Sequence, residues 1–212
     1  MKSKYVKKFN HDPSAAIYDQ IVKNEMNPIR NGYSAMMDWI REKTQDSNVL
    51  IDLGCGTGNT TKAVEYFDQI YCIDISQNML EIARNKLKNE KNIEFITTDL
   101  LELFDDHHKL RAVDTIISTY AIHHLTQDEK HILFEKISLL LPKNGKFVFG
   151  DLMFKNSEYE YEMQEKYPEL IDDFDDEYYW NLEDEVTKLR SLGFNIEITK
   201  FSDLSWGVIG EK

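Results

Sequence analysis

Glycine stands at every second position of a turn that follows a short apolar run. The glycines are Gly54, Gly56 and Gly58, and the run before them carries an acidic residue, Asp52. Because glycine lacks a Cβ atom, such a turn can be tight and a ligand can approach its backbone closely. A strand that leads into a glycine-rich turn and then a helix is the context in which such motifs bind nucleotide-like ligands. The pattern therefore predicts a ligand-binding loop.

Two further carboxylates, Asp74 and Asp99, end the next two apolar runs. A carboxylate at the first place can accept hydrogen bonds from two ribose hydroxyls. A carboxylate at the second can accept one from the exocyclic amine of adenine. A dinucleotide fingerprint would have glycine or alanine where Asn59 stands, so an NAD enzyme is disfavoured. The spacing favours an adenosine ligand without a pyrophosphate, and the alternative is that both carboxylates only cap turns.

Side chains that could act on a second substrate follow the fourth apolar run. They are Tyr120, His123 and His124. Histidine suits proton transfer because its unperturbed pKa lies near neutrality. The alternative is that one histidine caps the following helix while the other packs beneath it. We predict no metal site from the sequence.

Seven short β-rich runs must position these residues. They cover 49–54, 70–75, 93–99, 113–120, 146–152, 195–201 and 205–211. The first five are nearly continuous in apolar residues, as in parallel strands that are buried on both faces. Helical patterns separate them, which predicts an α/β fold with a doubly wound, seven-stranded and mostly parallel sheet. Only about three residues separate the last two runs, so these must form an antiparallel hairpin.

Helix boundaries are also visible in the sequence. Ser76 can cap a helix that extends through Asn89. Thr126 and Glu129 have the spacing of a capping box ahead of another helix. Before the sheet, residues 13–43 read as two helices that are broken near Asn27. We predict one domain over residues 1–212, with N-terminal helices (1–45), a cofactor-binding core (46–154), an acidic cap insert (155–185), and a helix end and terminal hairpin (186–212).

Charge and cysteine content restrict the partners and the location. The 212 residues carry a net charge of −13, which disfavours nucleic acid and anionic membrane surfaces as partners. No apolar run approaches the roughly 18 residues that a membrane helix needs. The two cysteines form no disulfide framework, and no secretory signal opens the chain. These features predict a cytoplasmic protein.

The acidity is concentrated in residues 158–185. This segment has 13 acidic residues against one lysine and holds seven of the 25 aromatic residues, whereas the rest of the chain is nearly neutral. Its carboxylates and aromatic faces could attract a cationic or amine-bearing acceptor. The alternative is a solvated helix face whose aromatic residues pack on the edge of the sheet. In either case the segment follows the fifth strand.

These motifs together resemble the class I S-adenosylmethionine-dependent methyltransferases. In detail the chain is similar to small bacterial members that have an N-terminal Tyr-Asp helix and a His-His-Leu sequence after the fourth strand. The resemblance implies S-adenosylmethionine as the cofactor and a cap after the fifth strand. It implies cofactor contacts for Tyr18, Asp52, Gly54, Gly56, Gly58, Asp74, Ile75, Met79, Asp99, Leu100 and Ser118.

The implied roles divide these residues by the part of the cofactor that they address. The glycines form the loop under the methionine moiety, with Asp52 organising that loop, and Asp74 holds the ribose. Ile75 and Met79 sandwich the adenine, while Asp99 and Leu100 address its edge. Ser118 lies where the backbone passes the cofactor, and Tyr18 closes over the methionine end. For Tyr18 and Met79, plain core packing is the alternative.

Three functional hypotheses follow. The first is a methyltransferase that acts on a small-molecule acceptor, with Tyr120, His123 and His124 as candidate catalytic residues. The second is a protein or RNA methyltransferase, and the acidic surface argues against RNA. The third is a protein that binds S-adenosylmethionine or S-adenosylhomocysteine without catalysis.

Overall fold

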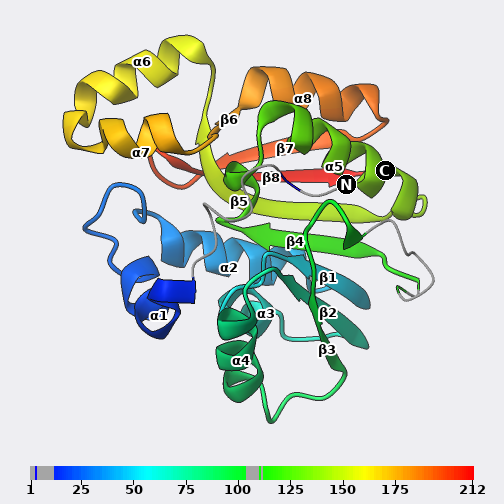
Figure 1. Ribbon diagram of the computed structural model, residues 1–212. Helices are drawn as coiled ribbons and strands as arrows, with labels where there is room; N and C mark the ends of the chain where they lie inside the picture. The colour runs from blue at the N-terminus through cyan, green and yellow to red at the C-terminus, as the bar shows by residue number, and fades with distance from the viewer. Residues whose placement is uncertain (1–2, 4–11, 104–109, 111) are drawn as a thin grey trace.

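The computed structural model describes residue 3 and residues 12–103, 110 and 112–212. A twisted sheet with the strand order β3-β2-β1-β4-β5-β8-β7 runs through the centre of the molecule (Figure 1). Its strands are β1 (Val49–Leu53), β2 (Gln69–Asp74), β3 (Ile93–Thr97), β4 (Thr115–Thr119), β5 (Lys146–Phe154), β7 (Asn195–Lys200) and β8 (Ser205–Glu211). Strands β1 to β5 pair in parallel, and β8 pairs antiparallel with both β5 and β7. The predicted fold class and terminal hairpin are confirmed.

Helices cover both faces of this sheet because its strands are apolar on both sides. One face packs against α2 (Tyr33–Lys43), α3 (Asn59–Ala63) and α4 (Gln77–Lys86), and its core includes Trp39, Val64 and Leu80. The other face packs against α5 (Gln127–Leu140) and α8 (Leu182–Ser191), where Phe134 and Leu189 are fully buried. The strand order reverses between β1 and β4. Open α/β sheets bind ligands at such a point, beyond the carboxyl ends of the strands.

The predicted helix caps form, and the N-terminal helices are shorter than expected. The Ser76 side chain accepts a hydrogen bond from the Met79 amide at 3.1 Å, and Thr126 and Glu129 form a complete capping box. Residues 13–43, however, contain a 3₁₀ turn η1 (Asp12–Ile17), a short helix α1 (Tyr18–Val22) and α2. The ten residues between α1 and α2 form turns, so the predicted break is a loop rather than a kink.

The acidic segment contributes an eighth strand that the sequence did not predict. It folds as α6 (Ser157–Lys166), η5 (Pro168–Leu170), α7 (Ile171–Asp176) and β6 (Trp180–Asn181), and continues into α8. Strand β6 has two residues and pairs in parallel with Met153 and Phe154, which extend β5 beyond its predicted end. A two-residue strand within a charged stretch has no alternating or continuous apolar pattern to reveal it.

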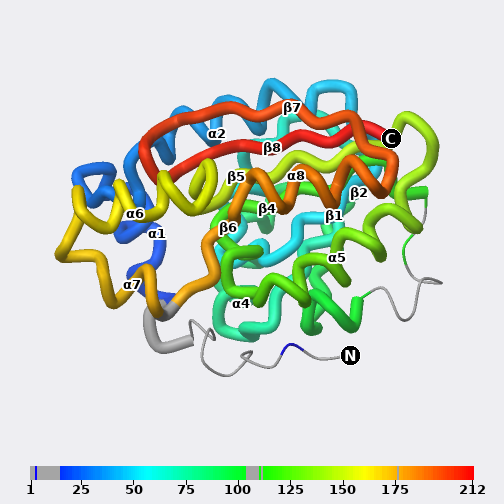
Figure 2. Tube along the Cα trace, turned by 90° about the horizontal axis from the view of Figure 1, so that it is seen from above, coloured from blue at the N-terminus to red at the C-terminus, as the bar shows by residue number. Residues whose placement is uncertain are grey.

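Aromatic side chains of the acidic segment pack inward. Phe174 is buried, and Tyr159, Tyr167 and Tyr179 pack against the same apolar cluster, while Tyr161 is exposed. In both views α6 and α7 lie at the same end of the molecule as α1 (Figures 1 and 2). Within the described residues, no helix is long and apolar enough to cross a membrane.

Candidate functional site

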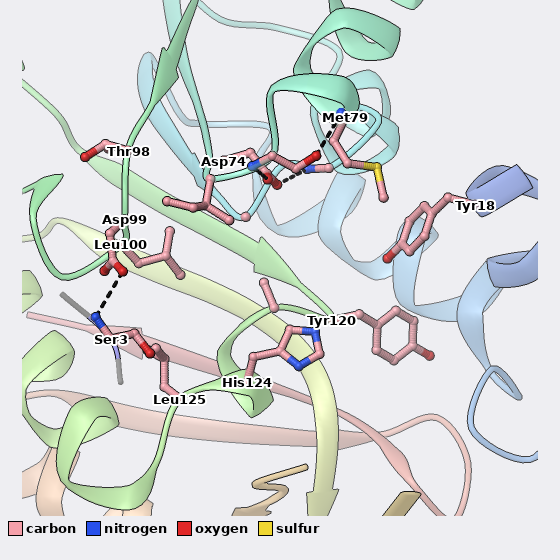
Figure 3. Close-up of a pocket in the computed structure, with 15 residues that line it drawn as sticks. Ser3, Tyr18, Asp74, Met79, Thr98, Asp99, Leu100, Tyr120, His124 and Leu125 are labelled. Carbon is pink, nitrogen blue, oxygen red and sulfur yellow. Dashed lines mark hydrogen bonds between the residues drawn. The ribbon is translucent and has the colours of Figure 1, made fainter. Parts of the chain in front are cut away.

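A pocket opens at the carboxyl ends of the parallel strands, where the strand order reverses (Figure 3). It offers about 740 Å³ of space, including the part open to solvent. Its lining residues are Ser3, Tyr18, Gly54, Gly56, Asp74, Ile75, Ser76, Met79, Thr98, Asp99, Leu100, Tyr120, Ala121, His124 and Leu125. Ten of the fourteen residues predicted to be functional are among them. The other four, Asp52, Gly58, Ser118 and His123, lie behind the lining.

The glycine-rich loop requires glycine for steric reasons. Gly54 and Gly56 have φ angles of 67° and 53°, in the left-handed region that disfavours other residues. A Cβ atom on Gly54 would also lie 2.4 Å from the Cβ of Ala121, in the turn after β4. The glycine-rich loop and the turn after β4 are therefore so close that only the methyl group of Ala121 fits between their backbones.

Asp74 fixes the loop from the end of the neighbouring strand. Its carboxylate accepts hydrogen bonds from the Gly56 amide and the Ser76 amide, both at 2.8 Å. A carboxylate oxygen can accept two hydrogen bonds, so Asp74 can accept from hydroxyls in the pocket as well as from amides. Ile75 is partly exposed and Met79 is buried, and both line the pocket beside this carboxylate.

Asp99 is a buried lining residue of the pocket, and it has a hydrogen-bond partner that the sequence did not indicate. Its Oδ1 accepts from the Leu101 amide at 2.8 Å, which is a local turn. Its Oδ2 accepts from the Ser3 amide at 3.0 Å (Figure 3). An adenine amine at this carboxylate would therefore share Oδ2 with Ser3 or displace it.

Helix α1 is fastened to the glycine-rich loop by Asp19, which the sequence analysis did not single out. Asp19 accepts from Thr57 at 2.6 Å and Asn59 at 3.0 Å, and it forms an ion pair with Lys86 at 2.7 Å. Burial opposes ionisation here, but the hydrogen bonds from Lys86 and Thr57 leave the pKa of Asp19 lowered overall. This pairing holds Tyr18, whose pKa burial raises, in the lining of the pocket (Figure 3).

Tyr120 has a strained backbone and a constrained side chain. Its φ angle of 48° is unusual for a bulky residue, a feature that is common in active sites. Its ring stacks on Tyr33 and lies 4.6 Å from the guanidinium of Arg30. Its hydroxyl lies 2.9 Å from the hydroxyl of Ser205. Burial raises the pKa of Tyr120 to about 12, so its hydroxyl stays protonated at neutral pH.

The two histidines occupy different environments in the 3₁₀ turn η4 (Ile122–His124). His124 lines the pocket, whereas His123 is 2% exposed and lies behind it. Asp151, in β5, accepts from the His123 amide at 3.0 Å and pairs with its ring Nδ1 at 2.5 Å. Asp151 also accepts from the Trp180 indole at 3.2 Å. One buried carboxylate thus joins three parts of the chain.

The chain matches the family described as the methyltransferase domain over residues 50–145. It is 32% identical over 206 residues to proteins named as uncharacterized methyltransferases from Bacillus cereus (strain ATCC 10987 / NRS 248) and Bacillus anthracis (strain A0248), covering 92% of both chains in each case. The chain belongs to the class I S-adenosylmethionine-dependent methyltransferases. The predicted family and enzyme class are thereby confirmed.

Solved structures show that the fold of this methyltransferase is shared widely. The DhpI–SAM–HEP complex superposes with a TM-score of 0.73 at 16% identity, covering 98% of this chain and 96% of the other. Magnesium protoporphyrin IX methyltransferase from Synechocystis PCC 6803, with bound SAH, superposes with a TM-score of 0.72 at 17% identity, covering 99% of both chains. At these identities the likeness concerns the fold alone.

Residues behind the pocket of the methyltransferase support its loop. Asp52 is fully buried, and its Oδ2 accepts from the Thr61 hydroxyl at 2.5 Å. Its Oδ1 has no hydrogen-bond partner among the described residues, and burial raises the pKa of Asp52 to about 7. Ser118 donates to the Leu53 carbonyl at 2.7 Å and so links β4 to β1. Gly58, with a φ angle of 80°, begins α3.

The pocket fits the family's cofactor. Gly54 and Gly56 line the pocket without side chains, Asp74 presents oxygens to the pocket, and the buried Asp52 has one oxygen without a partner among the described residues behind the loop. In contrast, no residue of the acidic segment lines the pocket in the described part of the chain. Among the described residues, Glu177 is the carboxylate of that segment that pairs with His123 and His124, and neither the spacing nor the composition of the segment distinguished it.

Proposed function

We propose that this methyltransferase transfers the methyl group of S-adenosylmethionine to a small-molecule acceptor that binds beside His124. The observation that carries the proposal is that one pocket is lined both by the strand-end carboxylates Asp74 and Asp99 and by Tyr120 and His124 from the turn after β4. A cofactor and an acceptor bound there would meet within one partly enclosed space.

The cofactor occupies the side of the pocket that is formed by β1, β2 and β3. Asp74 accepts from the ribose hydroxyls, while Ile75, Met79 and Leu100 enclose the adenine. Asp99 accepts from the adenine amine. Gly54 and Gly56 pass beneath the methionine moiety, which Tyr18 covers. The location of each of these residues in the lining of the pocket supports its role. S-adenosylmethionine supplies an activated methyl group on its sulfonium.

Asp52, Gly58 and Ser118 act on the cofactor through the backbone. The carboxylate of Asp52 holds Thr61 at the start of α3, and Ser118 holds the carbonyl of Leu53 beside the loop. Gly58 allows the turn into α3. Each of them shapes the loop from behind, which is a positioning role rather than direct contact.

The acceptor lies against His124. Holding an acceptor atom and the methyl group in line can supply roughly 7–11 kcal/mol of the barrier by proximity alone. A histidine at this position can in addition accept a proton from an amine or hydroxyl acceptor. Tyr120 stays protonated, so it donates a hydrogen bond rather than acting as a base. His123, which is held by Asp151, supports His124 from behind.

The acidic segment supports the part of the proposal that the acceptor is a small molecule. The segment is held behind the turn that carries His124 by the backbone bond from the Tyr178 amide to the His123 carbonyl at 2.9 Å. Its charge could raise the local concentration of a cationic or amine acceptor. Glu158, Glu160 and Glu162, however, lie outside the lining. Glu177 also lies outside it but pairs with His124, which lines the pocket, so any preference for a cation acts through that pair.

A cytoplasmic location is the remaining part of the proposal. Cys55 and Cys72 are both buried as free thiols, as expected for a protein from a reducing compartment.

Transfer of labelled methyl groups tests the proposal. The protein is incubated with methyl-labelled S-adenosylmethionine and a cell extract, which is then separated into small-molecule, protein and RNA fractions. We expect label in the small-molecule fraction, and much less label with an Asp74→Ala variant at a limiting concentration of S-adenosylmethionine. Label that accumulates in the protein or RNA fraction would overturn the small-molecule assignment and support the second hypothesis.

A further inference from the structure

Three side chains that can ligate metals converge beside the pocket from two distant parts of the chain. His123 and His124 belong to η4, and Glu177 follows α7. Each offers one nitrogen or carboxylate oxygen, and the three atoms all lie within 4.8 Å of one another. Nε2 of His123 is 3.4 Å from Oε2 of Glu177, and Nδ1 of His124 is 3.9 Å from Oε1. We propose that these side chains bind a divalent transition-metal ion of the zinc class.

The spacing of these atoms suits such an ion. Zinc binds imidazole nitrogen and carboxylate oxygen at about 2.0–2.2 Å in a tetrahedral arrangement, which separates neighbouring ligand atoms by about 3.3 Å. The separation between His123 and Glu177 already has this value within a tenth of an ångström or so. The separation between His124 and Glu177 exceeds this value by about half an ångström and involves the other carboxylate oxygen, so a side-chain rotation is needed to bring one oxygen of Glu177 to both rings. Three protein ligands leave one position open.

Asp151 orients the most buried of these ligands. It pairs with Nδ1 of His123, so the other ring nitrogen, Nε2, is directed to Glu177. A carboxylate behind a histidine is the usual support of a metal-bound imidazole, because it fixes the ring and makes the ligating nitrogen more basic. Asp151 is itself held by Trp180, which makes the arrangement rigid.

The chain around Glu177 is fixed to the same turn. The amide of Tyr178 donates to the carbonyl of His123 at 2.9 Å, and the ammonium of Lys130 donates to the carbonyl of Tyr178 at 2.5 Å. These two hydrogen bonds fix the backbone next to Glu177 and therefore the position from which its side chain reaches the histidines. Lys130 is buried beside Asp151 and also faces Glu185 and Glu129, so among the described residues carboxylates outnumber ammonium groups around the cluster, which favours a cation.

The open position faces the pocket, because His124 lines it. The ligand class for that position is a small molecule with a thiol or hydroxyl donor, and this part rests on the proposed function. With the ion bound, His124 is a ligand of the ion, and the acceptor atom contacts the metal instead of the imidazole. No metal site was predicted from the sequence, because Glu177 lies more than fifty residues beyond the histidines.

Zinc titration tests the proposal without using turnover. The full chain, freed of metal with a chelator, is titrated with Zn²⁺ by calorimetry, and Co²⁺ is added separately to record its ligand-field absorption. We expect one ion per chain and a Co²⁺ spectrum typical of tetrahedral coordination. Loss of a supporting residue lowers metal affinity by about 10–100-fold, so loss of a direct ligand in Glu177→Gln or His124→Gln should lower it by more than about 100-fold.

A matched variant separates ligation from general attraction. Asp175→Asn removes the same charge from an exposed position two residues away and should leave zinc affinity within about twofold. S-adenosylhomocysteine affinity, measured on each variant, verifies that the fold is intact. Zinc uptake below one ion per chain in the parent protein, or equal affinity in Glu177→Gln and the parent, would overturn the site. Either result leaves the proposed methyl transfer, with His124 facing the acceptor directly, to be judged by its own experiment.

Discussion

The two sides of the pocket are built in different ways. The cofactor wall, which we define as its lining residues between 54 and 100, comes from one continuous stretch of strand ends and turns. Each of its carboxylates binds a backbone amide two residues away, as Asp74 binds Ser76 and Asp99 binds Leu101, and also binds a remote amide, of Gly56 and Ser3 respectively. The acceptor wall, defined as residues 120–125 with Asp151 and residues 177–180 behind them, joins three remote parts of the chain.

This difference implies that the two walls respond differently to substitution. Backbone amides that bind a strand-end carboxylate stay in place as long as the local turn forms. A buried carboxylate that holds three partners is different, because losing it leaves each partner without its bond. We therefore expect cofactor binding to be insensitive to changes in the acceptor wall, and each prediction below tests that independence.

His124→Gln should have the largest effect. Whether His124 acts as a base or as a metal ligand, its loss removes the group that faces the acceptor, and kcat should fall by about 10²–10⁴-fold. The Kd of S-adenosylhomocysteine, measured by calorimetry, should stay within about twofold because the cofactor wall is untouched. His131→Gln, on the outer part of α5, serves as the control and should keep its kcat. An equal loss of cofactor affinity in His124→Gln would show that the walls are coupled.

Asp74→Ala tests the cofactor wall from the other side. A hydrogen bond to a charged group contributes about 1.5–3 kcal/mol, so the Kd of S-adenosylhomocysteine should rise by about 10–150-fold. Asp68→Ala is the matched control, because Asp68 is exposed just before the opposite end of the same strand, β2. Unchanged affinity in a folded Asp74→Ala variant would exclude the ribose role of this carboxylate.

Local signals made the cofactor wall predictable, whereas the acceptor wall depends on packing between remote segments. Asp74 and Asp99 could be found because a strand end, a turn and a helix start lie within a few residues. Asp151 stands within an apolar run, and nothing nearby indicates that Trp180 is its partner. The acidic segment was recognised as unusual, but its composition could not separate Glu177 from the exposed Glu158.

The N-terminal region, which is bonded to the loop of the cofactor wall, shows the same limit. Tyr18 was singled out from the resemblance, but Asp19 beside it was not, although Asp19 fastens α1 to the glycine-rich loop. Its ionic partner, Lys86, lies at the end of α4 and has no sequence feature that distinguishes it from other surface lysines. The packing of two helices decides which of their charged residues form ion pairs. The local sequence around Asp19 or Lys86 does not indicate that packing.

Asp151→Asn should affect stability more than cofactor binding. Asp151 is 1% exposed, and an asparagine cannot accept from the His123 amide, the His123 ring and the Trp180 indole in the same way. The free energy of unfolding in urea should fall by about 1–3 kcal/mol. The KM of the acceptor should rise while the Kd of S-adenosylhomocysteine stays within about twofold. A variant that retained the parent's stability would show that the acceptor wall is held by other contacts.

Asp203→Asn should have the smallest effect, because Asp203 joins the acidic segment to the hairpin at the surface, away from both walls. Hydrogen bonds from Lys166 and Tyr167 lower the pKa of Asp203 to about 2, against 3.8 for an ordinary aspartate. A lowered pKa stabilises the folded state above about pH 4, and this contribution disappears as the pH falls towards 2. Since the pair with Lys166 is largely exposed, the variant should lose at most about 1 kcal/mol of unfolding free energy at pH 7.

Urea unfolding of the parent and the Asp203→Asn variant at pH 7, 5 and 3 should show the difference in their stability narrowing with acid, while kcat and cofactor Kd remain those of the parent. A change in kcat would mean that the surface attachment of the segment also sets the geometry of the acceptor wall.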